Sequence, residues 1–184
     1  MIAGNHAALH GGGISGGGSI TNCTIRNNSA GGGQNNRPGT GGGIDGGGTI
    51  TNCTISGNSV FGNSLKGAGA GGGICSFGAT IANSTLSDNV VAYGSGGAIS
   101  NGRALTLQNN TFSHNSATQG GGIYNINLGS IGIGSTILST GDAVGENIVN
   151  EGGTITSSGY NLSSDDGGGL SKRPQAVRPI LIHS

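Results

Sequence analysis

Seven carboxylates and four histidines supply the acid–base chemistry of this 184-residue chain. Enzymes that cleave or epimerise polysaccharides need clustered carboxylates, commonly with Arg or Lys to neutralise a uronate. Asp88 and His114 stand at equivalent positions of two neighbouring sequence repeats, so stacked repeats would bring them within hydrogen-bonding reach. The same position is Asn27 and Gly57 in other repeats, which favours a solvated surface over a catalytic site. A polysaccharide lyase, hydrolase or epimerase is therefore the enzymatic alternative, with Asp88 and His114 as its catalytic candidates.

Asp165 and Asp166 are followed by three glycines and are the candidates for a metal site. Carboxylate oxygens suit calcium, but the nonapeptide pattern of calcium-binding β-helices is missing, which favours a surface turn. The chain has no Cys/His spacing typical of a metal site. Its glycine triplets match neither the phosphate-loop nor the dinucleotide-binding fingerprint. We therefore predict no metal ion and no cofactor.

Cys23 and Cys53 occupy the same position in two successive repeats. Stacking would place their Cα atoms about 4.8 Å apart. That separation lies within the range of a disulfide, although side-chain direction also matters. The position continues as Ser84 and Asn110, which favours a small buried residue over a disulfide. The oxidation state of this pair stays open.

The elements that must position these residues form a repeat, clearest from Gly41 to Asn58. Each copy opens with Gly-Gly-Gly-Ile or a variant and ends in a stretch like Thr-Ile-Thr-Asn-Cys-Thr-Ile-Ser-Gly-Asn. The isoleucines that follow the glycines recur at intervals of 30, 30, 25 and 24 residues. They are Ile14, Ile44, Ile74, Ile99 and Ile123. A period of this length indicates a solenoid. Short strands, Gly-rich turns and the lack of helical periodicity predict an all-β fold, a right-handed single-stranded parallel β-helix of about five to seven coils.

Two columns of asparagine run through the repeats, six residues apart. The first column is Asn22, Asn52, Asn83 and Asn109, and the second is Asn28, Asn58, Asn89 and Asn115. We expect each amide to bond to the equivalent amide one coil away, as in the stacked Asn ladders of cross-β structures. Asn52 in particular is expected to be buried, so that Asn52→Leu destabilises the fold. Ile50 is expected to point inward and its Thr neighbours outward.

The register of the repeat divides the chain into four parts. We predict an incomplete lead-in coil at 1–10, regular coils at 11–137, degenerate terminal coils at 138–170 and an irregular tail at 171–184. Repeat length varies only between the closing Asn and the next Gly run. The two longest such stretches, 29–40 and 59–70, are predicted loops on one side of the solenoid.

Composition excludes several classes of function. Gly and Pro number 43 and 3, a content close to that of disordered chains, but the periodic apolar residues argue against disorder. Only 8% of the residues are charged and the formal net charge is zero, so neither nucleic acid nor a charged membrane surface is an expected partner. No apolar run approaches the roughly 20 residues of a transmembrane helix. The start lacks the basic and apolar regions of a signal peptide, and we expect an internal part of a longer protein.

Outward threonines raise a further alternative, binding to ice or another regular lattice. Thr49 and Thr51 alternate with the inward Ile50 and would offer a repetitive hydroxyl face. The paired position changes to Ala82 and Gln108, so only two coils keep a Ser/Thr-x-Thr pair. Threonine is favoured on a solvated strand in any case, and we prefer that explanation.

One repeat carries a family resemblance. Gly96-Gly97-Ala98-Ile99 followed by Phe112-Ser113-His114-Asn115 resembles the paired GGAI and FxxN motifs of polymorphic outer membrane proteins, which are autotransporter adhesins. The other copies carry variants, and the likeness spans roughly residues 11–166. The segment from Gly153 to Leu162 is similar to the closing region of large bacterial surface β-helix proteins. The resemblance implies a right-handed β-helix on a secreted or surface-displayed bacterial protein, and it implies no ligand.

We therefore expect a non-enzymatic segment of an extracellular or outer-membrane-associated solenoid that acts as a stalk or adhesion surface. Its partner would be a protein or glycan on a host or neighbouring cell, bound along the outward Thr, Ser and Asn faces and the variable loops. Because a solenoid segment exposes strands at its ends, end-to-end self-association is also expected.

Overall fold

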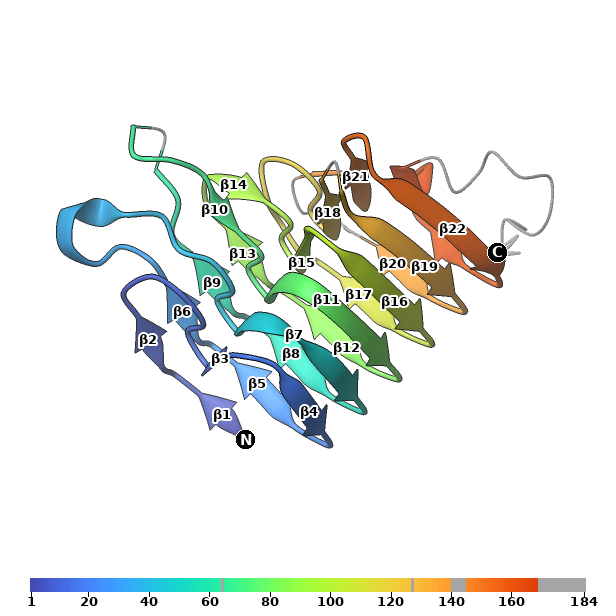
Figure 1. Cartoon of the computed structure of the whole chain (residues 1–184), viewed down its shortest axis with the longest axis horizontal. Coiled ribbons are helices and arrows are strands. Elements are labelled where there is room, and N and C mark those ends of the chain that lie inside the picture. The colour runs from blue at the N-terminus through green and yellow to red at the C-terminus, as the bar shows by residue number, and fades with distance from the viewer. Residues whose placement is uncertain (64, 127, 140–144, 169–184) are drawn as a thin grey trace, which may run out of the picture.

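The computed structural model describes residues 1–63, 65–126, 128–139 and 145–168. It shows a stack of parallel strands that makes a β-solenoid of about six turns (Figure 1). The named helical element is a short 3-10 helix, η1 (Gln34–Asn36), and residues 167–168, at the end of the described chain, also adopt 3-10 geometry. In this part of the chain, therefore, no helix is long and apolar enough to cross a membrane. The prediction of an all-β parallel β-helix is confirmed.

One side of the stack is a seven-stranded parallel sheet in which each turn contributes one strand. In spatial order its members are β1 (Ile2–Ala3), β5 (Thr24–Arg26), β8 (Thr54–Ser56), β12 (Thr85–Ser87), β17 (Thr111–Ser113), β20 (Ile137–Ser139) and β23 (Leu162–Ser163). The strand of one turn is thus paired with the equivalent strands of the turns before and after it.

A second, larger sheet forms the opposite side. Its members are β3 (Ile14–Ser15), β4 (Gly18–Thr21), β7 (Ile44–Thr51), β11 (Ile74–Ala82), β15 (Ile99–Asn101), β16 (Ala104–Gln108), β18 (Ile123–Asn125), β19 (Ser130–Gly134), β21 (Ile148–Asn150) and β22 (Thr154–Gly159). In the central turns β7 and β11 run through without a break, whereas the turns on either side divide this length into two strands.

Two small sheets complete the outline of each turn. The four-stranded sheet contains β2 (His6–Ala7), β6 (Ser29–Ala30), β9 (Ser59–Val60) and β13 (Val90–Val91). The two-stranded sheet pairs β10 (Gly69–Ala70) with β14 (Gly94–Ser95). The chain between these sheets forms the longer loops, at 31–39 and 61–68, which project from the same side of the stack (Figure 1). The ends of the predicted loops 29–40 and 59–70 therefore belong to strands or bridges.

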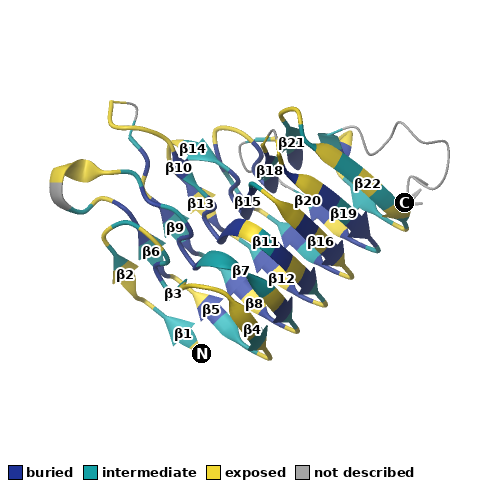
Figure 2. Cartoon of the chain, viewed as in Figure 1, coloured by how far each residue is buried: buried dark blue, intermediate teal, exposed yellow. Residues whose placement is uncertain are grey.

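The register of the sheets places equivalent repeat positions on top of one another. Ile74 pairs with Ile44 on one side and Ile99 on the other, and Ile81 lies between Ile50 and Leu107. These side chains are buried and form aliphatic columns inside the stack (Figure 2). Burial of each such side chain contributes roughly 1.5–3 kcal/mol. A separate small core of Ala30, Val60, Val91 and Ala117 lies behind the four-stranded sheet.

A continuous amide ladder runs through the second asparagine column. Asn58 Oδ1 accepts the backbone N–H and the Nδ2 of Asn28, both at 3.0 Å. Asn58 in turn donates its own N–H and Nδ2 to Asn89 Oδ1, and Asn89 donates likewise to Asn115. Asn5 extends the ladder by one turn, because its N–H and Nδ2 both donate to Asn28.

The cysteine column forms a second ladder with mixed chemistry. The backbone N–H of Cys23 donates to Cys53 Sγ at 3.4 Å, and that of Cys53 donates to Ser84 Oγ at 3.0 Å. Asn110, Thr136 and Asn161 continue the same pattern toward the C-terminal end. Both cysteines are free thiols, so the column uses Cys53 as a small hydrogen-bonding residue.

The first asparagine column differs from the buried ladder expected for it. Asn22, Asn52, Asn83 and Asn109 are all exposed, and each has a positive φ of 51–55°. Their amides bond in pairs, Asn52 to Asn22 and Asn109 to Asn83, at 3.2 Å. Asn tolerates the left-handed region better than other side chains, so this column serves a tight turn.

The glycine triplets let the turns pass close to the ladder. A Cβ atom on Gly43 would lie 2.7 Å from the Gly73 carbonyl oxygen and 3.1 Å from Cγ of Asn58. A Cβ on Gly42 would lie 2.3 Å from the Ser59 carbonyl oxygen, and Gly41 has a φ of 60°. A larger residue in this triplet would therefore force the backbone away from the buried amides.

The lead-in at 1–10 already belongs to the stack, because β1 pairs with β5 and β2 pairs with β6. Of the predicted terminal coils at 138–170, the structure describes 138–139 and 145–168, which contribute β21, β22 and β23. The predicted irregular tail at 171–184 lies outside the described residues.

The two asparagine columns predict opposite mutational results. Asn58→Ala would leave the Asn28 N–H and the Ile25 carbonyl without their partner, so we expect a loss of about 2–4 kcal/mol of unfolding free energy. Asn52→Gly keeps the positive φ and should change stability by no more than about 0.5 kcal/mol. Urea unfolding followed by circular dichroism would measure both. Equal losses in the two variants would contradict the assignment of the buried ladder to the second column.

Candidate functional site

The described residues bring an imidazole, a hydroxyl, a carboxylate and a thiol together at one bend of the solenoid. His10 and Thr40 each precede a glycine triplet and pair as bridge partners in adjacent turns. Asp45 and Cys75 each follow the isoleucine after a triplet and pair through β7 and β11. The bend at the glycines turns the two columns toward each other. We call His10, Thr40, Asp45 and Cys75 the polar corner.

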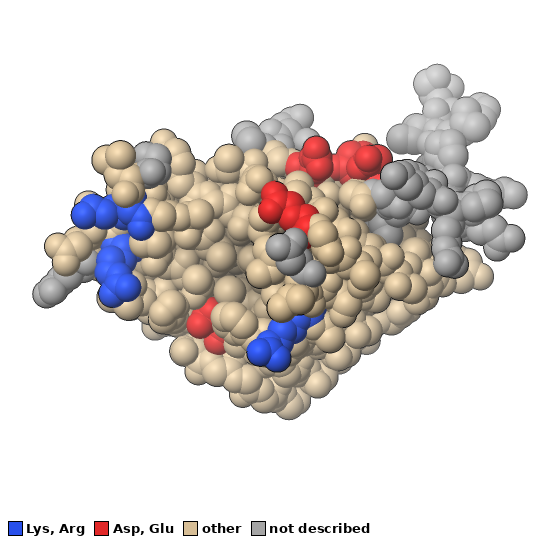
Figure 3. Space-filling view, turned by 45° about the horizontal axis from the view of Figure 1, so that its top comes forward, with Lys and Arg blue, Asp and Glu red and all other residues tan. Residues whose placement is uncertain are grey.

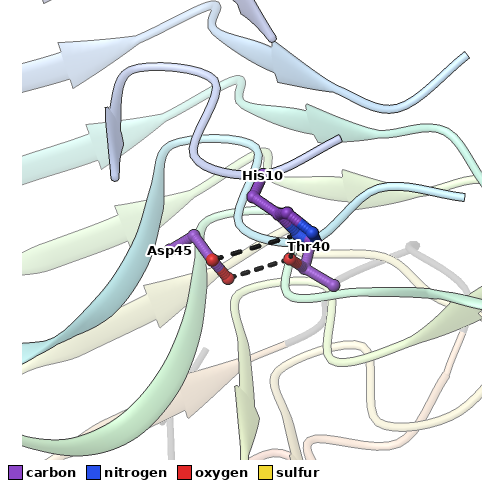
Figure 4. Close-up of polar contacts among 3 residues, drawn as sticks. All are labelled: His10, Thr40 and Asp45. Carbon is purple, nitrogen blue, oxygen red and sulfur yellow. Dashed lines mark hydrogen bonds and ion pairs between the residues drawn. The ribbon is translucent and has the colours of Figure 1, made fainter. Parts of the chain in front are cut away.

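The first three residues form a hydrogen-bonded chain (Figure 4). Thr40 Oγ1 donates to Asp45 Oδ1 at 2.9 Å, and His10 Nδ1 lies 2.7 Å from Thr40 Oγ1 and 4.0 Å from Asp45 Oδ2. Since the single hydroxyl proton points to Asp45, Nδ1 of His10 must be the donor to Thr40. In neutral His10 this leaves Nε2 as an acceptor on a side chain that is 57% exposed. Asp45, at 14% exposure, is the shielded anchor of the chain.

Cys75 is the least reactive member of the polar corner. Burial raises the pKa of its thiol to about 12, and the charge and hydrogen bond of the Asp45 carboxylate act in the same direction. The Thr40 side chain has the smallest of these effects, and it acts in the opposite direction. Because the thiolate is the nucleophile, Cys75 does not supply one at neutral pH. The corner can thus tie adjacent turns together and offer His10 Nε2 to a ligand, but its thiol is not activated.

We predict that Cys23 and Cys75 of the folded protein are alkylated at different rates. At pH 8, iodoacetamide should modify half-buried Cys23 first, whereas Cys75 should react only after denaturation, because its thiol stays protonated and buried. Peptide mass spectrometry over a time course would give the two rates. Modification of Cys75 in the folded protein as fast as that of Cys23 would contradict the raised pKa.

The two residues of the predicted catalytic pair share a column, but their side chains are not linked. Asp88 and His114 occupy one column as expected, each at an exposed turn position with a positive φ of 56° and 52°. Within the described residues, no hydrogen bond or ion pair links their side chains. Their column continues as Asn27 and Gly57, also with positive φ, so it resembles the exposed turn of the first asparagine column.

Asp165 is an exposed residue whose carboxylate accepts hydrogen bonds from the protein itself, at the last described turn. Its Oδ2 accepts the backbone N–H of Asn147 at 2.7 Å, and its Oδ1 accepts Asn147 Nδ2, Ser163 Oγ and the N–H of Gly167. Asp166 accepts only the N–H of Gly168 among the described residues. Across the described chain, no group of three or more His, Cys, Asp or Glu side chains is placed to hold a metal ion.

These contacts shift the titration of Asp165. Burial would raise its pKa, but the hydrogen bonds from Asn147, Gly167 and Ser163 outweigh burial and hold the pKa below its usual value of 3.8. The buried Nδ2 of Asn147 also donates to the Leu138 carbonyl, as Asn115 does to Leu86. Asn147 and Asp165 thereby replace the asparagine pair of the regular turns.

A depressed pKa makes a prediction about acid stability. The stabilisation from ionised Asp165 should be fully present above about pH 4, the unfolded-state pKa, and should be lost as the pH falls through the lower folded-state pKa. Asp165→Asn should therefore be less stable than the parent at pH 6, with the difference shrinking toward pH 2. Urea melts at several pH values would test this, with Asp166→Asn as the matched control. A difference that is independent of pH would contradict the role of the carboxylate.

Asp45 is one of the seven carboxylates of the sequence, and no sequence motif connects it with His10, Thr40 or Cys75. The available signal was positional, because the residues before a glycine triplet and after its isoleucine flank the same bend. Comparison with protein-family models, with curated proteins and with solved structures found no match for this chain. The assignment of function therefore depends on the geometry of the described residues and on the motifs in the sequence.

Proposed function

We propose that this chain is a non-enzymatic segment of a secreted or cell-surface β-solenoid, where it serves as a stalk and adhesion surface. The observation that carries the proposal is the unbroken file of hydrogen-bonded amides from Asn5 to Asn115, which is buried from Asn28 onward. Asn147 and Asp165 form a similar pair at the last described turn. The turns from Asn5 to Asn115 are thereby bonded to one another at equivalent points, which favours a rigid rod over a hinged assembly.

The distribution of polar chemistry supports this proposal. Most buried polar side chains bond to the adjacent turn, so they are committed to holding the stack together. Outside, the surface consists mainly of uncharged residues, with few and scattered charged side chains on the face shown in Figure 3. The loops 31–39 and 61–68 project from one side and offer variable contact surface (Figure 1). A surface protein or glycan of another cell fits this arrangement as a partner.

The likeness to polymorphic outer membrane proteins supports an extracellular, outer-membrane-associated location within the same proposal. End-to-end association also belongs to it, because β3 and β4 pair with β7 on one side only and leave an open sheet edge.

Adhesion of coated beads would test the proposed function. Beads carrying the full chain should bind to cultured epithelial cells or to other bacteria several-fold more than beads carrying the heat-unfolded chain. The same protein should release no reducing ends from polygalacturonate. Adhesion no higher than that of the unfolded control would contradict the proposal. Polysaccharide cleavage that His10→Gln abolishes would instead establish an enzyme at the polar corner.

A further inference from the structure

A groove of about 430 Å³ lies along the outer face of the four-stranded sheet. Its floor is an outward column of side chains from four successive turns, His6, Ser29, Ser59 and Val90, which pair in register. At a strand separation of 4.7–4.9 Å, the floor extends roughly 14 Å along the solenoid axis. The groove is thus elongated in the direction in which the turns stack.

Loops close one side of this groove. Asn36, from η1, and Phe61, which directly follows β9, are both among the lining residues. The Phe61 ring lies against the Gly32 backbone, since a Cβ atom on Gly32 would be 3.5 Å from Cγ of Phe61. Phe61 nevertheless remains 38% exposed. An aromatic face is therefore held at the wall of a polar floor.

Some polar side chains of the groove have a hydrogen-bond partner within the described residues and others have none. His6 Nδ1 and Ser29 Oγ are 2.9 Å apart, which orients the imidazole along the floor. Among the described residues, the Ser59 hydroxyl and the Asn36 amide have no hydrogen-bond partner. Together these side chains offer donors and acceptors at intervals along the floor, while Lys, Arg, Asp and Glu are absent from the described lining.

We propose that this groove binds a neutral oligosaccharide laid along the solenoid axis. Sugar rings present apolar C–H faces that pack on an aromatic side chain and hydroxyls that exchange hydrogen bonds with Ser, Asn and His. The uncharged lining favours a neutral sugar over a uronate, whose carboxylate would find no cation there. The inference names a ligand class for the adhesion surface and so rests on the proposed function.

A peptide strand fits the groove less well. Binding by strand addition requires free backbone groups at a sheet edge. The N–H groups of Ser29, Ser59 and Val90 already donate to Asn5, Asn28 and Asn58 of the preceding turn. The groove lies over a face of the sheet, so a peptide would have to bind through side chains alone.

Titration of the full chain with neutral hexasaccharides of the cello-, manno- and laminari- series would test the proposal. We expect at least one of them to shift the imidazole NMR signals of His6 in a saturable manner. Phe61→Ala should weaken that binding roughly tenfold or more. Phe77→Ala is the matched control, because Phe77 is 57% exposed in β11 and lines a different groove. If Phe61→Ala does not fold, Asn36→Ala on exposed η1 takes its place, with the same loss expected.

Several results would overturn the inference. These are no shift with any neutral hexasaccharide, equal binding by Phe61→Ala and the parent, or preference for hexagalacturonate or an extended decapeptide. The bead assay separates this failure from failure of the proposed function. A parent chain that adheres but binds none of the neutral hexasaccharides would reject the groove alone, whereas a parent chain that neither adheres nor binds a saccharide would reject the adhesion surface as well.

Discussion

The structure depends on one interaction, the hydrogen bonds between a buried asparagine and the same residue one turn away. Asn58 shows why asparagine is suited to this position. Its Oδ1 accepts from the turn before it, and its Nδ2 donates both to the Ile25 carbonyl of that turn and to Asn89 of the turn after it. A buried amide with unmet partners would be costly, so each turn makes the next one favourable. Among the described residues every buried side-chain nitrogen and oxygen has a partner. The aliphatic columns form the larger hydrophobic core, but apolar packing alone does not specify which turns are neighbours.

The fold was predictable because this interaction repeats in the sequence. Ile44, Ile74 and Ile99 mark the turns, and the closing asparagines mark the bend where the ladder lies. The role of the first asparagine column was not predictable from residue type alone. Asparagine is suited both to a buried ladder and to a turn with positive φ, and the sequence contains the same letter in both cases. The distinction comes from backbone geometry, with Asn52 at a φ of 54° and exposed, and Asn58 fully buried.

The candidate site was less predictable because it does not repeat. The column of His10 and Thr40 continues as Ala70, and the column of Asp45 and Cys75 continues as Ser100, so neither column carries a recurring chemistry. Only the bend at the glycines brings the two columns together. The groove beside the four-stranded sheet adds a further requirement, because the position of Phe61 depends on a loop whose conformation follows from no periodicity.

The mixed ladder shows that one position of the solenoid accepts several different residue types. Its acceptors are, in order, the sulfur of Cys53, the hydroxyl of Ser84, the amide of Asn110, the hydroxyl of Thr136 and the amide of Asn161. Each of these side chains accepts a backbone N–H from the adjacent turn. A gene duplication or deletion that spans one whole coil would therefore leave both flanking coils with a suitable hydrogen-bond acceptor. Recombination can thus change the number of coils in such a protein more freely than other properties. Solenoids of different length could be encoded by otherwise similar genes without substitutions among the buried residues.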